Sequence, residues 1–159
     1  MLKPYLCVAC EKVIINQPDS VASLISLFSK MILTIPEGTE VPKNAVAPKE
    51  WAVFSIWDPQ PGDELRNYSL CTQILYPDGT QYGEIVKSKV NIEPNKRAQI
   101  SVQIQGLPMG QAGEYKIRTW IEEDGGQVGD VIQFGIEVIM KFVAASTDAS
   151  PVTPGATSF

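Results

Sequence analysis

The amino-acid sequence predicts an all-β protein, an antiparallel β-sandwich of about 7 to 9 strands. Beyond residue 50, apolar side chains often recur at every second position, which is typical of strands with one buried side and one wet side. Groups of Pro, Gly, Asp and Asn separate these runs and favour tight turns. Short strands punctuated in this way, without a helical period, indicate two packed sheets.

The clearest strand covers residues 97–105, where four apolar residues at even positions alternate with polar residues. Residues 131–142 alternate in the same manner, with Val131 and Ile139 as apolar exceptions. Both strands are therefore expected to pack on a shared core. The same reasoning predicts six strands in this part of the chain, near 51–57, 66–76, 81–92, 97–105, 114–123 and 130–142.

The first 35 residues contain two less regular segments. Residues 5–16 are apolar and become β-branched toward their end, which predicts a strand buried on much of both faces. Residues 21–35 fit either a helix capped at Asp19 or Ser20 or a β-strand. A Pro-Asp-Ser turn at 18–20 joins two apolar runs, and this arrangement favours a hairpin.

Two segments show no regular period. Residues 36–50 contain three prolines and are expected to form a long connection that crosses from one sheet to the other. From Ala144 onward the composition is mostly Ala, Ser, Thr, Pro and Gly, which cannot bury enough apolar surface to order itself. The sequence thus predicts a sandwich domain at 1–143 and a flexible tail at 144–159, whose last residue, Phe159, is a candidate contact with a neighbouring molecule.

Composition limits the function. The chain of 159 residues is long enough for one core without disulfides. Its net charge of −5 and its scattered Lys and Arg residues disfavour nucleic acid and anionic membranes as partners, and no apolar run approaches the ~20 residues that span a bilayer. Three cysteines and no expected signal peptide predict a cytoplasmic location. We therefore expect a protein partner or self-association.

The residues that usually carry chemistry are sparse. The chain has no histidine, which excludes Ser-His-Asp and Cys-His catalysis and histidine metal sites. Cys7 and Cys10 form a C-x-x-C sequence, but positions three apart on a strand face opposite sides. Acidic groups at 58–64 and 122–130 lack the spacing of a calcium loop and are expected to be solvated turns. We expect no catalytic residue, no cofactor and no metal, with a carboxylate or metal enzyme as the third hypothesis.

Gly113-Glu114-Tyr115 begins a predicted strand in the manner of a tyrosine corner, in which the phenol bonds to an upstream backbone group. Along this strand Tyr115 faces the core, whereas Trp120 lies on a charged face beside Arg118. An apolar ring on such a face needs a cover, which either the 36–50 connection or a partner protein supplies.

Trp51 and Trp57 share one face of their predicted strand, and their rings also need a cover. One of them is expected to be a core residue of the sandwich. The candidate interface residues are Trp120, Arg118, Trp51, Trp57 and Phe159. The leading hypothesis is a non-enzymatic protein that acts by protein contact, as a structural subunit or homo-oligomer whose tail reaches a neighbour. The alternative is a small-ligand or carbohydrate-binding module that uses its tryptophans as a stacking platform.

Five segments carry a resemblance to a known family: YLCVACEKVIINQ at 5–17, an apolar second segment after it, AVFSIWD at 52–58, YPDGT at 76–80 and GEYKIRTWIEEDG at 113–125. Through them the chain resembles a bacterial family known only as a domain of unknown function with a predicted immunoglobulin-like sandwich. The likeness covers about residues 4–140 and leaves the tail unmatched. It implies an immunoglobulin-like fold and carries over no catalytic residues.

Overall fold

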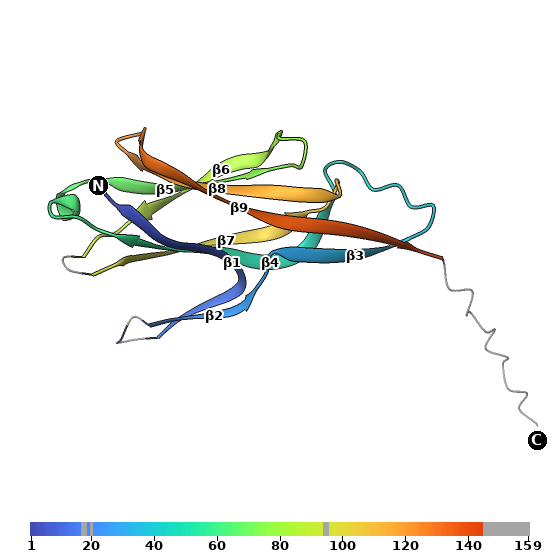
Figure 1. The fold of residues 1–159 in the computed structure, drawn as a ribbon, viewed down its shortest axis with the longest axis horizontal. Helices are drawn as coiled ribbons and strands as arrows, with labels where there is room; N and C mark the ends of the chain where they lie inside the picture. Colours follow the sequence, from blue (N-terminus) through green and yellow to red (C-terminus); the bar gives the residue numbers. More distant parts are fainter. Residues whose placement is uncertain (17–18, 20, 94–95, 145–159) are drawn as a thin grey trace, which may run out of the picture.

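The computed structural model describes residues 1–16, 19, 21–93 and 96–144, and it is all-β, with two packed sheets (Figure 1). A four-stranded sheet has the order β2-β1-β4-β7, and a five-stranded sheet has the order β3-β9-β8-β5-β6. One turn of 3₁₀ helix, η1, covers Asp63–Leu65. The strands are β1 (Lys3–Asn16), β2 (Val21–Leu27), β3 (Lys30–Pro36), β4 (Val46–Asp58), β5 (Tyr68–Leu75), β6 (Gln81–Val90), β7 (Ala98–Pro108), β8 (Gly113–Glu123) and β9 (Gly126–Val143).

One strand pair differs from the antiparallel prediction. β3 runs parallel to β9, from Lys30 opposite Glu137 to Pro36 opposite Val143, whereas the other pairs are antiparallel. The chain changes sheets just before β3: the amide of Phe28 donates to Ala9 of β1, and the amide of Glu137 donates to Ser29. Parallel neighbours need a long connection, which is available here because β3 and β9 lie far apart in the sequence.

The N-terminal half follows most of the sequence predictions. β1 and β2 form the expected hairpin, so the helical alternative for residues 21–35 is wrong. The connection after β3 does cross from the five-stranded to the four-stranded sheet, but it is shorter than expected, because β4 already begins at Val46. The predicted tail beyond Ala144, with Phe159, lies outside the described residues.

The main core fills the space between the two sheets. Its buried residues include Val102 from β7, Ile117 from β8 and Val138 from β9, so the two alternating strands do share one core. Phe142, however, is 53% exposed, contrary to the prediction for the end of the last strand. The pairing of β8 with β9 stops at Gly113 opposite Val138, and beyond that point only β3 accompanies β9.

A tyrosine corner fixes the start of β8, as predicted. The Tyr115 hydroxyl donates to the carbonyl oxygen of Gln111 and accepts from its amide, both at 3.0 Å. Gly113 enters the strand with a φ of 126°, and a Cβ atom there would lie 3.1 Å from Pro77. Both the backbone conformation and the close approach therefore favour glycine at this position.

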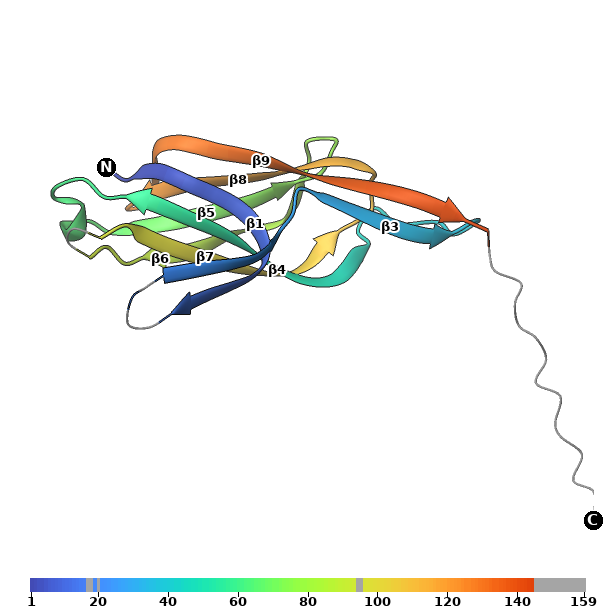
Figure 2. The same cartoon turned by 60° about the horizontal axis from the view of Figure 1, so that its bottom comes forward.

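A second, smaller core lies on the opposite face of the four-stranded sheet. Cys10, Ala52 and Phe54 are buried there, and Val13 and Leu24 of the β1–β2 hairpin pack against them. The hairpin leaves the four-stranded sheet on the side away from the five-stranded sheet (Figures 1 and 2). It thus forms a partial third layer over β4.

We expect Phe54→Ala to lower the free energy of unfolding by about 3–5 kcal/mol, because truncating a fully buried ring leaves a cavity. Phe54 is 1% exposed, whereas Phe142 is 53% exposed. Phe142→Ala is therefore the matched control and should cost below about 1 kcal/mol. Urea denaturation measures both, and an equal effect of the two substitutions would contradict the second core.

Tyr115→Phe should cost about 1–2 kcal/mol, because it leaves both backbone groups of Gln111 without their partner. Tyr82→Phe serves as the control, since the Tyr82 ring, like that of Tyr115, packs against Tyr76, at 5.6 Å, but its side chain is only partly buried. Thermal unfolding compares the two variants. If Tyr115→Phe is as stable as the control, the corner does not hold β8.

Candidate functional site

The structure places Trp51 and Trp57 in the main core, at 0% and 1% exposure. The Trp51 indole donates to the carbonyl oxygen of Gly106 at 3.0 Å, and the Trp57 indole donates to Ser55 Oγ at 3.0 Å. Their assignment to an interface is therefore wrong, and so is the tryptophan stacking platform for a sugar. We expected one core tryptophan, but alternate positions of β4 bring both rings inward.

Trp120 lies on the outer face of β8 and is 8% exposed. Its indole donates to Glu122 at 3.3 Å, and Glu122 also pairs with Lys87 of β6 at 2.6 Å. Burial, followed by hydrogen bonding to Glu122, raises the pKa of the neighbouring Cys71 thiol to about 11. The Trp120 ring is thus already surrounded by its own sheet and offers little surface to a partner.

Arg118, the remaining described interface candidate, is half-buried and donates to Gln73 at 3.3 Å. The connection that we considered as a cover for this face makes its contacts near the start of β8. There Lys43 pairs with Asp78 at 2.8 Å, and Gln111 also donates to Asp78. The candidates chosen from the sequence therefore do not form one site.

A different surface gathers exposed apolar side chains. We call it the hairpin surface, and it consists of residues of β1 and β2 that are 38–60% exposed, namely Ile14, Ile15, Val21, Ile25 and Leu27. On the paired strands Ile14 lies opposite Ser23, Lys12 opposite Ile25 and Asn16 opposite Val21. Ile14, Val21 and Ile25 point away from the second core, on the face opposite to Val13 and Leu24. Ile15 pairs with Ala22 and Leu27 with Cys10, and these two side chains are exposed at the two ends of the hairpin.

β2 is also an edge strand. Among the described residues it pairs with β1 alone, and its sequence, VASLISL, contains no charge and no proline. Charged residues, prolines and bulges normally protect such edges, and β3 and β6 carry lysines of this kind, while β7 exposes Gln103 and Gln105. On β2, apolar exposure and an open backbone edge coincide.

The base of the hairpin is fastened to the sandwich by Glu11. Its carboxylate accepts from Lys49 of β4, and hydrogen bonds from Lys49 and then Ser26 lower its pKa. Ser26 has a φ of 53°, in the left-handed region that residues other than glycine seldom adopt. This conformation interrupts β2 after Ile25 and lets the hairpin turn over the sheet.

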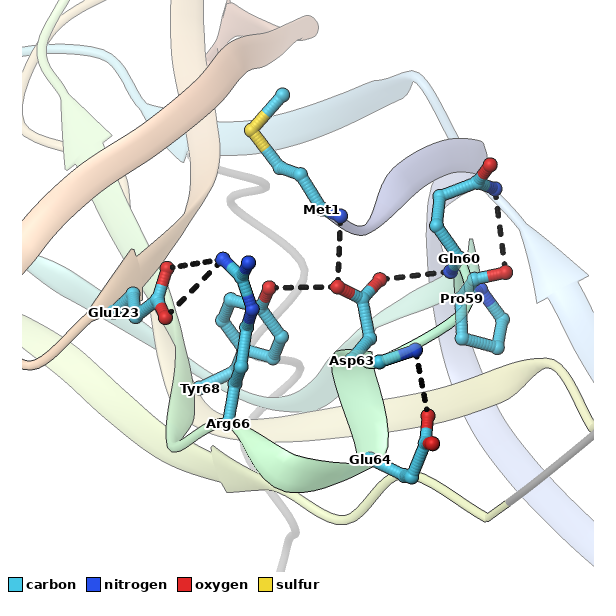
Figure 3. A network of polar contacts seen from close by, with 9 residues as sticks. Met1, Pro59, Gln60, Asp63, Glu64, Arg66, Tyr68 and Glu123 are labelled. Atoms are coloured by element: carbon cyan, nitrogen blue, oxygen red, sulfur yellow. Dashed lines mark hydrogen bonds and ion pairs between the residues drawn. The ribbon is translucent and has the colours of Figure 1, made fainter.

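At one end of the sandwich a buried carboxylate organises the loop before β5 (Figure 3). Asp63, which we expected to be a solvated turn residue, is 1% exposed. Its Oδ1 atom accepts from the amino group of Met1 at 2.7 Å and from the Tyr68 hydroxyl at 2.9 Å. Its Oδ2 atom accepts from the Gln60 amide at 2.8 Å. The prediction failed because Tyr68 and Met1 enclose this carboxylate.

These partners decide the charge of Asp63. Burial opposes ionisation, but the bonds from the Met1 amino group, the Gln60 amide and Tyr68 outweigh it and lower the pKa of Asp63. Burial and the adjacent Asp63 raise the pKa of Tyr68 to about 12. A carboxylate that is stably ionised and bound on both oxygens is suited to holding a loop, and it is a poor proton acceptor for a substrate.

Beside this network lies an open cavity of about 590 Å³ between the loop at 58–64 and the residues Ile92, Glu93, Lys96 and Arg97. Four of its charged side chains form two ion pairs, Arg97 with Asp58 and Lys96 with Glu93, both at 2.6 Å, and Glu64 accepts from the Gly62 amide. The Arg97 guanidinium also lies 3.8 Å from the centre of the Tyr5 ring. The cavity therefore presents satisfied ion pairs, which give a ligand little to bind.

The cysteines divide between the two cores. Cys7 packs against the main core, with its Sγ 3.5 Å from Thr119 Oγ1, whereas Cys10 lies in the second core. The prediction that their sulfurs diverge is confirmed. All three cysteines are free, and within the described part of the chain no three His, Cys, Asp or Glu side chains come together as metal ligands would.

Asp63→Asn should lower the free energy of unfolding at pH 7 by about 2 kcal/mol, since it places an amide where two oxygens accept hydrogen bonds. Because the pKa of Asp63 is lowered in the folded state, its contribution is present above about pH 4 and is lost as the pH falls further. The wild-type and variant stabilities should therefore approach each other as the pH falls below about 4. Glu64→Gln, an exposed neighbour, is the control in denaturation curves across this range, and a pH-independent difference would contradict the assignment.

Comparisons with known proteins add no assignment: no protein-family model matches the sequence, and no curated protein is significantly similar to it. The resemblance to a bacterial family of unknown function remains a prediction from the sequence motifs. Among the described residues there is no helix of the length and apolar character that crossing a bilayer requires. The candidate functional site accordingly rests on geometry alone, and the hairpin surface is where that geometry is most unusual.

Proposed function

We propose that this protein acts by binding a protein, without catalysis, and that the hairpin surface is its contact site. The observation that carries the proposal is the coincidence on β2 of exposed apolar side chains with an unpaired strand edge. Several exposed apolar side chains on one hairpin are typical of interaction sites, and an open edge can add a strand from a partner. A structural or assembly role is the form of this function that we favour.

The strand order supports an immunoglobulin-like arrangement as the finer description of the fold. β1, β4 and β7 correspond to strands A, B and E, and β9, β8, β5 and β6 to strands G, F, C and C′. The tyrosine corner of Tyr115 falls on the strand that corresponds to F. The chain departs from antibody domains in lacking a disulfide and in carrying Trp51 and Trp57 on β4, which corresponds to B, and not on C.

Charge and thiol content support the rest of the proposal. The net charge of −5 favours a protein partner over nucleic acid, and three free cysteines fit a reducing cytoplasm. The internal pairing of the ionic groups around Asp63 and Arg97 argues for a structural use of those carboxylates. Self-association, as a homo-oligomer, belongs to the same class of function.

Photo-crosslinking in the producing cells tests the proposal. With p-benzoylphenylalanine in place of Ile25, we expect a discrete covalent adduct with a protein after irradiation, because this side chain is 42% exposed at the centre of the hairpin surface. The same photoreactive residue in place of Gln103, exposed on the edge strand β7, is the control. Mass spectrometry identifies each adduct. If the Ile25 position gives no more adduct than the Gln103 position, the hairpin surface is not a contact site.

A further inference from the structure

The β1–β2 hairpin is built like half of a larger sheet. β1 pairs with β4 only as far as Cys10, and from Lys12 to Asn16 it pairs with β2 alone. A ribbon of two strands is marginally stable, whereas three or more strands with a buried face are stable. Val13, Ala22 and Leu24 on the inner face of this ribbon pack on its own sandwich, whereas no other described part of the chain pairs with its outer edge or covers its outer face.

The regular part of β2 is complementary to itself. Ser26, with its left-handed φ of 53°, limits the extended segment to Val21–Ile25, so that Ser23 lies at its centre. When two such segments run antiparallel about a two-fold axis at Ser23, Val21 lies opposite Ile25 of the other copy, and Ala22 lies opposite Leu24. Apolar and β-branched pairs of this kind stabilise neighbouring strands.

Charge also permits this pairing. β2 carries no charged residue, so two copies can meet without placing like charges opposite each other. The wider molecule has a net charge of −5, and its repulsion should weaken the encounter at low ionic strength. An interface of backbone bonds and apolar contacts should therefore tighten as salt is added, which is opposite to the behaviour of an interface held by ion pairs.

From these features we infer that the partner at the hairpin surface is a second copy of this chain, joined through antiparallel pairing of the two β2 edges about Ser23. This inference rests on the proposed function and names its partner. The two hairpins then form one four-stranded ribbon, and each inner face stays packed on its own second core. The isologous contact closes after two copies, so the product is a dimer.

Sedimentation equilibrium and light scattering of the full chain test this inference. The pairing joins two five-residue segments and should bury less than a standard interface of about 1,600 Å², so we expect a weak monomer–dimer equilibrium, with a dissociation constant on the order of hundreds of micromolar. A species of twice the chain mass should appear at these protein concentrations, and its fraction should be larger in 0.5 M NaCl than in 0.05 M NaCl. Ser23→Lys places two ammonium groups at the two-fold axis and should raise the dissociation constant about tenfold or more. Gln103→Lys, on the other edge of the same sheet, should leave it unchanged.

A cysteine cross-link tests the register. Directly opposite Cβ atoms in an antiparallel pair lie roughly 4.5–5.5 Å apart, close to the reach of a disulfide. Ser23→Cys should therefore give a covalent dimer on oxidation, while the wild-type chain and Gln103→Cys should not. Ser23 is exposed, so these variants should keep the wild-type circular dichroism spectrum and melting temperature.

The outcomes separate the two proposals. A chain that stays monomeric to about 1 mM, or a dimer that Ser23→Lys leaves intact, overturns the inference of a second copy. If the Ile25 photo-adduct then contains a different protein, the proposed contact site stands and only the identity of its partner is wrong. If the wild-type chain dimerises and Gln103→Lys abolishes the dimer, the contact lies on β7 and both proposals fail.

Discussion

The rest of the structure depends on a single strand with two buried faces. Trp51, Val53 and Trp57 of β4 pack into the main core, while Ala52 and Phe54 pack on the other side of the same sheet. A two-layer sandwich can bury only one face of a sheet, since the other normally meets water. The second face of β4 therefore requires an additional layer, and the β1–β2 hairpin supplies it. The fold of the N-terminal third is a consequence of this requirement.

That role explains why the hairpin is both well attached and incompletely covered. Val13 and Leu24 bind it to the second core, and Glu11 ties its base to Lys49. Because successive side chains on a strand alternate, placing these residues inward turns Ile14, Val21 and Ile25 outward. No other layer of the described molecule lies over them. The apolar side chains on the outer face are thus exposed because the inner face of the same hairpin must cover β4. Binding of a partner would remove these side chains from water.

The alternation of apolar and polar residues along the sequence made much of this fold predictable. The features that it did not predict depend on contacts between residues that are far apart in the sequence. The period of two in residues 97–105 and 114–123 placed β7 and β8 within a few residues, and Gly113 with Tyr115 indicated the corner that the hydrogen bonds to Gln111 confirm. Nothing local showed that β3 would pair in parallel with β9, more than 100 residues later. Asp63 looked like a turn residue because its neighbours are polar, yet the enclosure by Tyr68 and Met1 buries it. The hairpin surface was missed for a related reason, because we took tryptophan as a sign of an exposed binding surface. Residues 51–57 are apolar on both faces of their strand, which already indicated that another layer of the protein must cover each face.

The distribution of polar groups argues against placing the function at the ends of the sandwich, where loops commonly bind ligands. At the Asp63 end, four of the charged side chains that line the cavity form two ion pairs with one another. These pairs are exposed, so a ligand that exchanges them for ion pairs of its own gains little free energy. On the hairpin surface a partner displaces only water from apolar side chains and adds backbone hydrogen bonds to a free edge. Binding at this surface therefore breaks no hydrogen bond or ion pair of the kind that the described residues form around the cavity.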